Sequence, residues 1–262
     1  MHVGRSYRRP TSIMAGVELE RGVDPQTVRG AQLDIVQRLV DGSVDADHAA
    51  EKLDALFPTK QPACSDSSKY TPEHYVFELW SSLLTWGTAV PAEHEGQAAI
   101  VSAMQRLQKL HTDDLDGARV WEDVPRLPWA LREVFQLHGE ATDEPGFTNT
   151  SALYARIAQS GLYDTLDFGV IRFREALEEA VPAEQVPAHM SAVSQWLQYA
   201  GQLLFNGGKP SHESSRLCSP GSLWQGPGGL NPERWAFWKQ RLGQLGQDTL
   251  LAVSYTHLRA HE

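Results

Sequence analysis

The amino-acid sequence predicts an all-α protein, an irregular multi-helix bundle of about nine helices with long loops and no regular repeat. Three observations lead to this prediction. Helix start signals recur along the chain, the apolar residues that follow them have helical spacing, and strand signals are poor. No run of five or more residues alternates convincingly between apolar and polar, and no Asn-Gly or Asp-Gly pair joins two β-rich runs.

Proline follows a capping residue at three places, Asp24-Pro25, Thr71-Pro72 and Asn231-Pro232. The capping side chain accepts a hydrogen bond from an unpaired N–H group of the first turn, and proline at the next position has no N–H group to leave unpaired. Glu73 and Glu233 then place a negative charge where the helix dipole favours it. Each pair therefore predicts the start of a helix.

Helical periodicity extends these starts and adds further helices. The expected helices cover about residues 24–42, 49–57, 71–87, 100–110, 128–135, 153–160, 170–180, 193–205 and 232–245. The tryptophans at positions 80, 86, 196, 235 and 238 fall on these helices and are predicted to pack several helix pairs into one core. No repeat of fixed period is present, so a helical solenoid is not supported.

A single helical domain is predicted over residues 23–251, after a flexible N-terminal tail over residues 1–22. Residues 58–72, 138–150 and 207–230 interrupt the helical pattern and are predicted to be loops. A loop as long as 207–230 is usually functional or disordered. Trp224 lies in this Gly/Ser-rich loop, and a large aromatic side chain there predicts that the loop is anchored to the domain.

Composition and charge narrow the possible partners. The chain has 33 acidic and 23 basic side chains and a formal net charge of −10, so its surface repels a phosphate backbone and we expect no nucleic-acid partner. No apolar run approaches the ~20 residues that span a bilayer, so no membrane segment is expected. The N-terminus lacks the apolar region of a signal peptide. Cys64 and Cys218 are interpreted as free thiols in a reducing compartment, which predicts a cytoplasmic location.

Linear catalytic signatures are missing from the sequence. There is no G-x-S-x-G elbow and no Walker loop, and His94-Glu95 is followed by Ala98 where a zinc protease needs a second histidine. No Glu-x-x-His pair of a di-iron bundle occurs, and the reversed spacing of His48 and Glu51 is more typical of a solvated helix face. We therefore assign no catalytic, cofactor-binding or metal-ligating residue, and we expect no cofactor.

Two further segments have a chemical and a structural interpretation. The glycine-rich run 226–229 precedes a helix start and could cradle an anion, but Pro232 removes a donor and Glu233 repels negative charge, which favours a linker. The neighbouring Glu178 and Glu179 could serve acid–base catalysis, yet nothing in the pattern marks them as buried, so a solvated helix face is predicted.

Three residues near the C-terminal end form a candidate partner-binding set, Trp224, Arg234 and Trp235. Arginine beside exposed aromatic side chains is the composition enriched at binding hot spots. The competing interpretation is that the helical tryptophans Trp235 and Trp238 are simply core, and it is favoured because aromatic residues are usually buried.

Several segments resemble a known family. They are residues 168–178 (FGVIRFREALE), residues 195–201 (QWLQYAG), residues 223–226 (LWQG) and residues 232–239 (PERWAFWK), together with the helix that carries Trp80. They resemble the fungal family called domain of unknown function 3632, over about residues 25–250. The resemblance implies a helical intracellular protein of filamentous fungi, and it brings no activity, cofactor or catalytic residue.

The last ten residues, 253–262 (VSYTHLRAHE), resemble a translated sequencing-adaptor fragment. Residues 252–262 are therefore predicted to be an artefactual tail that is not part of the helical domain. The tryptophan-rich helices and the anchored loop favour a non-enzymatic scaffold that binds a protein partner. The alternatives are an enzyme whose residues converge from different helices, and a binder of a small hydrophobic ligand.

Overall fold

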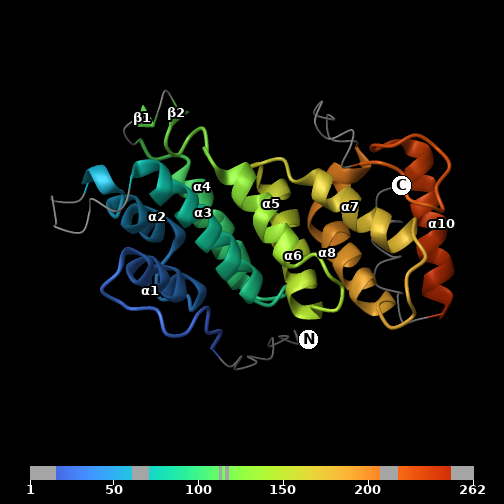
Figure 1. Cartoon of the computed structure of the whole chain (residues 1–262), viewed down its shortest axis with the longest axis horizontal. Helices are drawn as coiled ribbons and strands as arrows, with labels where there is room; N and C mark the ends of the chain where they lie inside the picture. Colours follow the sequence, from blue (N-terminus) through green and yellow to red (C-terminus); the bar gives the residue numbers. More distant parts are fainter. Residues whose placement is uncertain (1–15, 61–70, 112–113, 116–117, 207–217, 249–262) are drawn as a thin grey trace, which may run out of the picture.

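The computed structural model describes residues 16–60, 71–111, 114–115, 118–206 and 218–248 of the chain (Figure 1). Within these ranges the chain forms nine α-helices and a short 3₁₀-helix, which confirms the predicted all-α class. The elements in chain order are α1 (Val28–Val40), α2 (Ala46–Ala55), η1 (Pro58–Lys60), α3 (Pro72–Ala89), α4 (Glu95–Leu107), β1 (Asp114–Leu115), β2 (Ala118–Arg119), α5 (Leu127–Leu137), α6 (Glu144–Ser160), α7 (Leu166–Leu177), α8 (Val186–Phe205) and α10 (Pro232–Asp248).

The helices are spread along the long axis of the molecule in approximately the order of the chain (Figure 1). Helices α1 to α4 lie at one end, α5 and α6 lie in the middle, and α7, α8 and α10 form the other end. Helix α6 packs closely on α8 and also contacts α3 and α4, so it connects the two ends. Buried apolar side chains from Leu19 to Leu242 form one continuous core.

Two of the three capping prolines begin a helix as predicted. Thr71 Oγ1 accepts a hydrogen bond from the His74 N–H at 3.2 Å at the start of α3. Asn231 Oδ1 accepts one from the Arg234 N–H at 2.8 Å at the start of α10. In both cases the cap satisfies a first-turn donor that has no intrahelical partner.

The third start, at Asp24-Pro25, is wrong by a few residues. Helix α1 begins at Val28, and its cap is Thr27, whose side chain accepts from the Gly30 N–H at 3.0 Å. Asp24 instead accepts from the Gln26 N–H at 2.9 Å and stabilises a turn before the helix. An aspartate followed by proline suits such a turn as well as it suits a cap, so the pair alone does not distinguish them.

Helices α6 and α8 begin earlier than the sequence predicts. Each carries a proline in its first turn, which is tolerated because first-turn N–H groups have no helical acceptor. The predicted loop 138–150 is therefore wrong from Glu144 onwards. The first half of α6 lacks an apolar stripe because residues 148–151 are polar yet buried. Two of their hydroxyl groups, on Thr150 and Ser151, donate to carbonyl oxygens four residues earlier.

A two-residue antiparallel pairing joins β1 and β2, with Asp114 opposite Arg119 and Leu115 opposite Ala118. Strands this short cannot produce the alternation by which a strand is recognised. They flank Asp116-Gly117, which lies outside the described residues.

The predicted tryptophan core is present. Trp80, Trp86, Trp196 and Trp238 are almost completely buried, and Trp235 is 7% exposed. Trp121, which follows β2, is also buried and meets Trp80 edge-to-face with ring centroids 5.8 Å apart. Edge-to-face aromatic contacts add to the stability gained by burial.

Part of the predicted N-terminal tail packs on the helices. Leu19 is 7% exposed, and its N–H donates to Gln37 Oε1 at 3.1 Å. Gln37 in turn donates to the carbonyl oxygen of Val17 at 2.6 Å. The tail prediction for residues 1–15, the tail 252–262 and Cys64 lie outside the described residues. No helix in the described ranges has the length and apolarity needed to cross a membrane.

Candidate ligand-binding cleft

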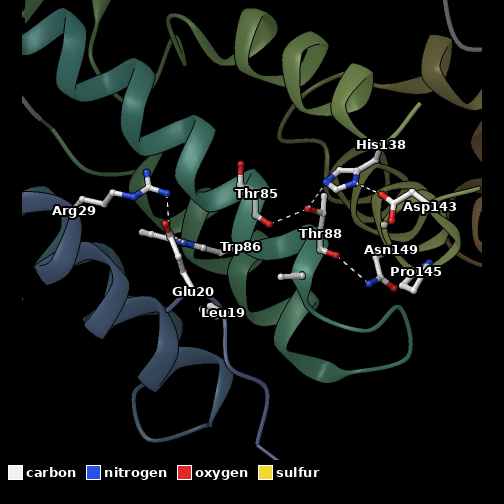
Figure 2. Close-up of a pocket in the computed structure, with 12 residues that line it drawn as sticks. Leu19, Glu20, Arg29, Thr85, Trp86, Thr88, His138, Asp143, Pro145 and Asn149 are labelled. Carbon is white, nitrogen blue, oxygen red and sulfur yellow. Dashed lines mark hydrogen bonds and ion pairs between the residues drawn. The ribbon is translucent and has the colours of Figure 1, made fainter. Parts of the chain in front are cut away.

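An open cleft lies where the segment before α1, the helix α1 itself, the C-terminal end of α3 and the junction between α5 and α6 meet (Figure 2). Its volume of about 450 Å³ is typical of small-molecule sites. Charged, hydroxyl, amide and apolar groups all contribute to its lining, from residues Leu19, Glu20, Arg29, Thr85, Trp86, Thr88, Ala89, His138, Asp143, Pro145, Gly146 and Asn149.

One wall carries a hydroxyl, an imidazole and a carboxylate in a hydrogen-bonded chain (Figure 2). His138 Nε2 lies 3.1 Å from Thr88 Oγ1, and His138 Nδ1 lies 2.8 Å from Asp143 Oδ2. The Thr88 hydroxyl also bonds to the carbonyl oxygen of Thr85 at 2.8 Å, and rotation about its Cβ–Oγ1 bond directs its proton to either acceptor. This order of groups is the one found in nucleophile–base–orienter triads.

The three residues come from the ends of three different helices. Thr88 lies in the last turn of α3, His138 is the C-cap of α5, and Asp143 is the N-cap of α6. Thr88 is only 2% exposed, whereas the His138 side chain is 23% exposed. Both residues line the cleft, and Thr88 is the less accessible of the two.

Helix α7 holds the backbone of His138 in place through Arg172. The Arg172 side chain is 1% exposed, and its Nη2 donates to the His138 carbonyl oxygen at 2.8 Å. The guanidinium lies 4.2 Å from the ring centroid of Phe135 and 3.8 Å from that of Phe147, which are cation–π contacts. Burial lowers the pKa of Arg172, and the Glu175 carboxylate at 3.0 Å opposes that shift.

Asn149 and Gln97 fix the end of α3, which carries Thr88. Asn149 Nδ2 donates to the Thr88 carbonyl oxygen at 2.9 Å, while Asn149 Oδ1 accepts from the Ala92 N–H at 3.0 Å. Gln97 Nε2 donates to the carbonyl oxygen of Gly87 at 3.2 Å and to that of Asn149 at 3.0 Å. Because these amides are buried and bonded, they position the wall and have little capacity left to bind a ligand.

Gly146 leaves room for the contact between the His138 imidazole and the Asp143 carboxylate. A Cβ atom at this position would lie well under 3.0 Å from both Asp143 Oδ2 and His138 Nδ1. Only a residue without a side chain leaves room for that pair. Gly146 is also in the first turn of α6, so its N–H group points out of the helix end with no intrahelical acceptor.

The opposite wall holds a second carboxylate, that of Glu20 (Figure 2). Glu20 Oε2 accepts from Arg29 Nη2 at 2.7 Å and from Trp86 Nε1 at 2.7 Å. Arg29 Nη1 also donates to Ser82 Oγ at 2.8 Å. Burial acts to raise the pKa of Glu20, but the bonds from Trp86 and Arg29 and the charge of Arg29 outweigh it, so the pKa lies below its usual value.

A family model described as "Protein of unknown function (DUF3632)" matches residues 80–242, more than half of the chain. The chain belongs to this family. The resemblance inferred from the sequence is thereby confirmed, over a somewhat narrower range than expected. No curated protein and no solved structure matches the chain. Thr88, His138 and Asp143 lie inside the region that matches DUF3632, and Glu20 and Arg29 precede it.

Two of the segments that resemble DUF3632 meet in a buried ion pair at the other end of the molecule. Glu178, at the end of α7, and Arg234, in the first turn of α10, both have fully buried side chains. Glu178 Oε1 accepts from Arg234 Nε and from Trp238 Nε1, each at 2.6 Å. Glu178 Oε2 accepts from Arg234 Nη2 at 3.0 Å and from the Gly221 N–H at 2.8 Å.

All five N–H donors of Arg234 are used. The three that do not reach Glu178 donate to the carbonyl oxygens of Cys218, Ser219 and Gly229, at 2.8, 3.1 and 2.9 Å. The described part of the loop is thus tied to the start of α10 through main-chain acceptors. The prediction that Glu178 lies on a solvated face is wrong, because its partner comes from a distant helix that the local pattern does not reveal.

The three predicted partner-binding residues are not all at the surface. Arg234 is fully buried and Trp235 is 7% exposed, so an exposed patch that includes either of them is wrong, and the favoured interpretation of Trp235 and Trp238 as core residues is confirmed. Trp224 is half-buried, with its ring centroid 5.3 Å from that of Phe237 and its Nε1 donating to the Pro227 carbonyl oxygen at 2.9 Å. These contacts anchor the described part of the loop, while partner binding by Trp224 stays a prediction.

The other candidates from the sequence lie apart from the cleft. His48 is exposed and pairs with Asp45 at 2.9 Å. Cys218 is buried, and burial together with Asp167 raises the pKa of its thiol to about 12. The described ranges contain no group of three or more His, Cys, Asp or Glu side chains placed to hold a metal ion. The sequence did not predict the cleft residues, because no regular interval along the chain relates them to one another.

Proposed function

We propose that the cleft is an active site for the hydrolysis of a small ester, with Thr88 as nucleophile and His138 as its general base. The observation that carries this proposal is the Thr88–His138–Asp143 chain, with distances of 3.1 and 2.8 Å, inside an open cleft. Such a site belongs to the class of enzymes whose residues converge from different helices.

The protons balance in this scheme. With the neutral imidazole protonated on Nδ1 toward Asp143, Nε2 is free to accept the Thr88 proton. The Thr88 oxygen then bonds to the ester carbonyl carbon, the bond to the leaving alcohol breaks, and that alcohol takes the proton from Nε2. Water next attacks the acyl-threonine, gives a proton to His138, and releases the acid as Thr88 recovers its proton.

The environment supports the charge changes of this reaction. Asp143 stabilises the imidazolium that forms on His138. Gly146, in the first turn of α6, borders the cleft, and its N–H group can donate to negative charge developing on the substrate, whereas Asp143 offsets the helix dipole at this end. Because Thr88 lines the cleft and is almost completely buried, only a small or slender acyl group reaches it.

The test measures turnover of p-nitrophenyl acetate and p-nitrophenyl butyrate by the full chain, with mass spectrometry for an acyl adduct on Thr88. Thr88→Val keeps the shape of the side chain and removes the nucleophile, so we expect turnover and adduct to fall to background. His138→Asn is expected to lower the rate about 10²-fold or more. Circular dichroism confirms that each variant is folded.

His48→Asn is the matched control, because His48 forms the same imidazole–carboxylate pair with Asp45 on an exposed surface. We expect this variant to hydrolyse both esters at the wild-type rate. If Thr88→Val retains the wild-type rate and no adduct forms on Thr88, the proposal is wrong and the three side chains only tie α3, α5 and α6 together. The scaffold function, a protein partner and a cytoplasmic location stay predictions.

A further inference from the structure

The wall opposite His138 contains a carboxylate already bound by two donors. Glu20 reaches into the cleft from the segment before α1, and Arg29 and Trp86 each donate to the same oxygen, Oε2, at 2.7 Å (Figure 2). The Arg29 guanidinium also lies 5.4 Å from the centroid of the Trp86 ring. Arginine beside an indole N–H is a combination suited to recognising a carboxylate.

The two donors, Arg29 and Trp86, lie on helices, whereas the acceptor, Glu20, lies in the segment before α1. Trp86 is a core residue of α3 with 1% exposure, and Ser82, one turn earlier, holds the other side of Arg29. Glu20 belongs to a segment without helical or strand structure, which Gln37 ties to α1 through Val17 and Leu19. The side chains of Arg29 and Glu20 remain 39% and 32% exposed.

We infer that Arg29 and Trp86 form a recognition site for the carboxylate of a small-molecule ligand, and that Glu20 occupies this site when the ligand is absent. An exposed ion pair of this kind contributes little to the free energy of unfolding, so replacing the Glu20 carboxylate by that of a ligand costs little free energy. The cleft volume of about 450 Å³ fits a small molecule.

The inference rests on the proposed function in one respect, because the ligand is taken to be the substrate whose ester group lies at Thr88. Trp86 and Thr88 both line the cleft, so a substrate that occupies its length can contact both. The substrate class is then the ester of a small dicarboxylic acid, with its free carboxylate on Arg29 and its ester over Thr88.

Binding is measured without turnover in the Thr88→Val background, by titration calorimetry with succinate as the probe and succinamide as the uncharged control. Glu20→Gln removes the resident negative charge and keeps the shape of the side chain. We expect it to bind succinate about threefold to fivefold more tightly than the parent, because the competing carboxylate, whose exposed ion pair is worth less than about 1 kcal/mol, is gone. Succinamide is expected to gain nothing.

Glu18→Gln is the matched control, since Glu18 lies on the same segment and pairs with the exposed Arg21 outside the cleft lining. It should leave succinate affinity unchanged. Arg29→Met should abolish succinate binding in both the parent and the Glu20→Gln background. If Glu20→Gln binds succinate no better than the parent, or binds succinamide equally well, the carboxylate site is wrong.

The two proposals fail in different ways. Tight succinate binding by Glu20→Gln with no ester hydrolysis by the wild type would overturn the proposed function and keep the carboxylate site. Hydrolysis of p-nitrophenyl acetate that depends on Thr88, together with no effect of Glu20→Gln on succinate affinity, would overturn the carboxylate site and keep the proposed function.

Discussion

The protein uses the same three chemical groups twice, in two environments. At the α7–α10 end, the Glu178 carboxylate binds Arg234 and the indole of Trp238, and at the cleft the Glu20 carboxylate binds Arg29 and the indole of Trp86. The first ion pair is fully buried. The second is about one-third exposed.

Saturation of the donors separates the two clusters further. Arg234 uses five N–H groups and Glu178 accepts four bonds, so neither has capacity for a ligand. Arg29 donates one bond to Glu20 and one to Ser82, and its side chain meets solvent. The comparison teaches that burial and saturation, and not the identity of the residues, decide whether a Glu–Arg–Trp cluster holds the fold or offers a site.

The largest expected effect is that of Arg234→Met. It leaves the Glu178 carboxylate buried without its cationic partner, which costs about 3–5 kcal/mol of unfolding free energy. The matched change at the cleft, Arg29→Met, should cost less than about 1 kcal/mol because that pair is exposed to solvent. Urea unfolding followed by circular dichroism measures both. Equal losses in the two variants would contradict the division into a structural and an exchangeable cluster.

The double variant Glu178→Leu, Arg234→Met tests whether the two buried charges stabilise the fold as a pair. Removing both charges leaves no unpaired ion in the core, so we expect the double variant to be at least about 1 kcal/mol more stable than Arg234→Met alone. It should stay below the wild type, because Trp238 Nε1 and the Gly221 N–H lose their acceptor. A double variant whose loss equals the sum of the two single losses would show that the charges do not act as a pair.

Gly146→Ala tests the cleft wall. The added methyl group would collide with both His138 and Asp143, and relief of such overpacking costs about 1–3 kcal/mol. The variant should also lose ester hydrolysis, because the imidazole is displaced from the carboxylate. Gly16→Ala is the control, since a Cβ there meets nothing within 4 Å. An unaltered melting temperature and wild-type hydrolysis in Gly146→Ala would refute the close approach.

The smallest expected effect is that of lowering the pH, which weakens the contact of Glu20 with Arg29 and Trp86. Because the pKa of Glu20 is lowered in the folded protein, its ionised form stabilises the segment above the carboxylate's unfolded pKa, and this contribution is lost as pH falls through the folded pKa. The indole N–H resonance of Trp86 should therefore shift with falling pH in a two-dimensional NMR spectrum. The Trp80 indole donates to the carbonyl oxygen of Pro125 at 3.0 Å, an acceptor that does not titrate, so its resonance should stay in place until the protein unfolds. Simultaneous movement of both resonances would argue against a separate opening of the Glu20 contact.

Local sequence signals predicted most of the fold. The caps at Thr71 and Asn231 work through bonds to N–H groups three residues away, so the information needed to find them is contained in a few neighbouring residues. The start of α6 was missed because its first half presents buried polar groups instead of an apolar stripe, and the hydroxyls of Thr150 and Ser151 donate to carbonyl oxygens of the helix itself. Burial of these polar groups depends on the helices that pack on α6, which include α3, α4 and α8.

The candidate site could not be predicted in the same way. His138 and Asp143 are five residues apart across a helix junction, and Thr88 is fifty residues upstream of His138. No spacing rule joins them, because their approach depends on how α3, α5 and α6 pack. Trp235 and Arg234 were proposed for a surface because the local sequence does not reveal that Glu178 and Phe173 cover them.

The sequence by itself determined that the chain is helical, approximately where most helices lie, and that the tryptophans form a core, since caps and apolar periodicity are local properties of the chain. Only the tertiary structure decided which of two similar carboxylates is buried. That choice depends on whether a distant helix supplies enough donors to replace water around the charge. For Glu178, α10 and the loop before it supply them, whereas Glu20 keeps part of its water and stays open to exchange.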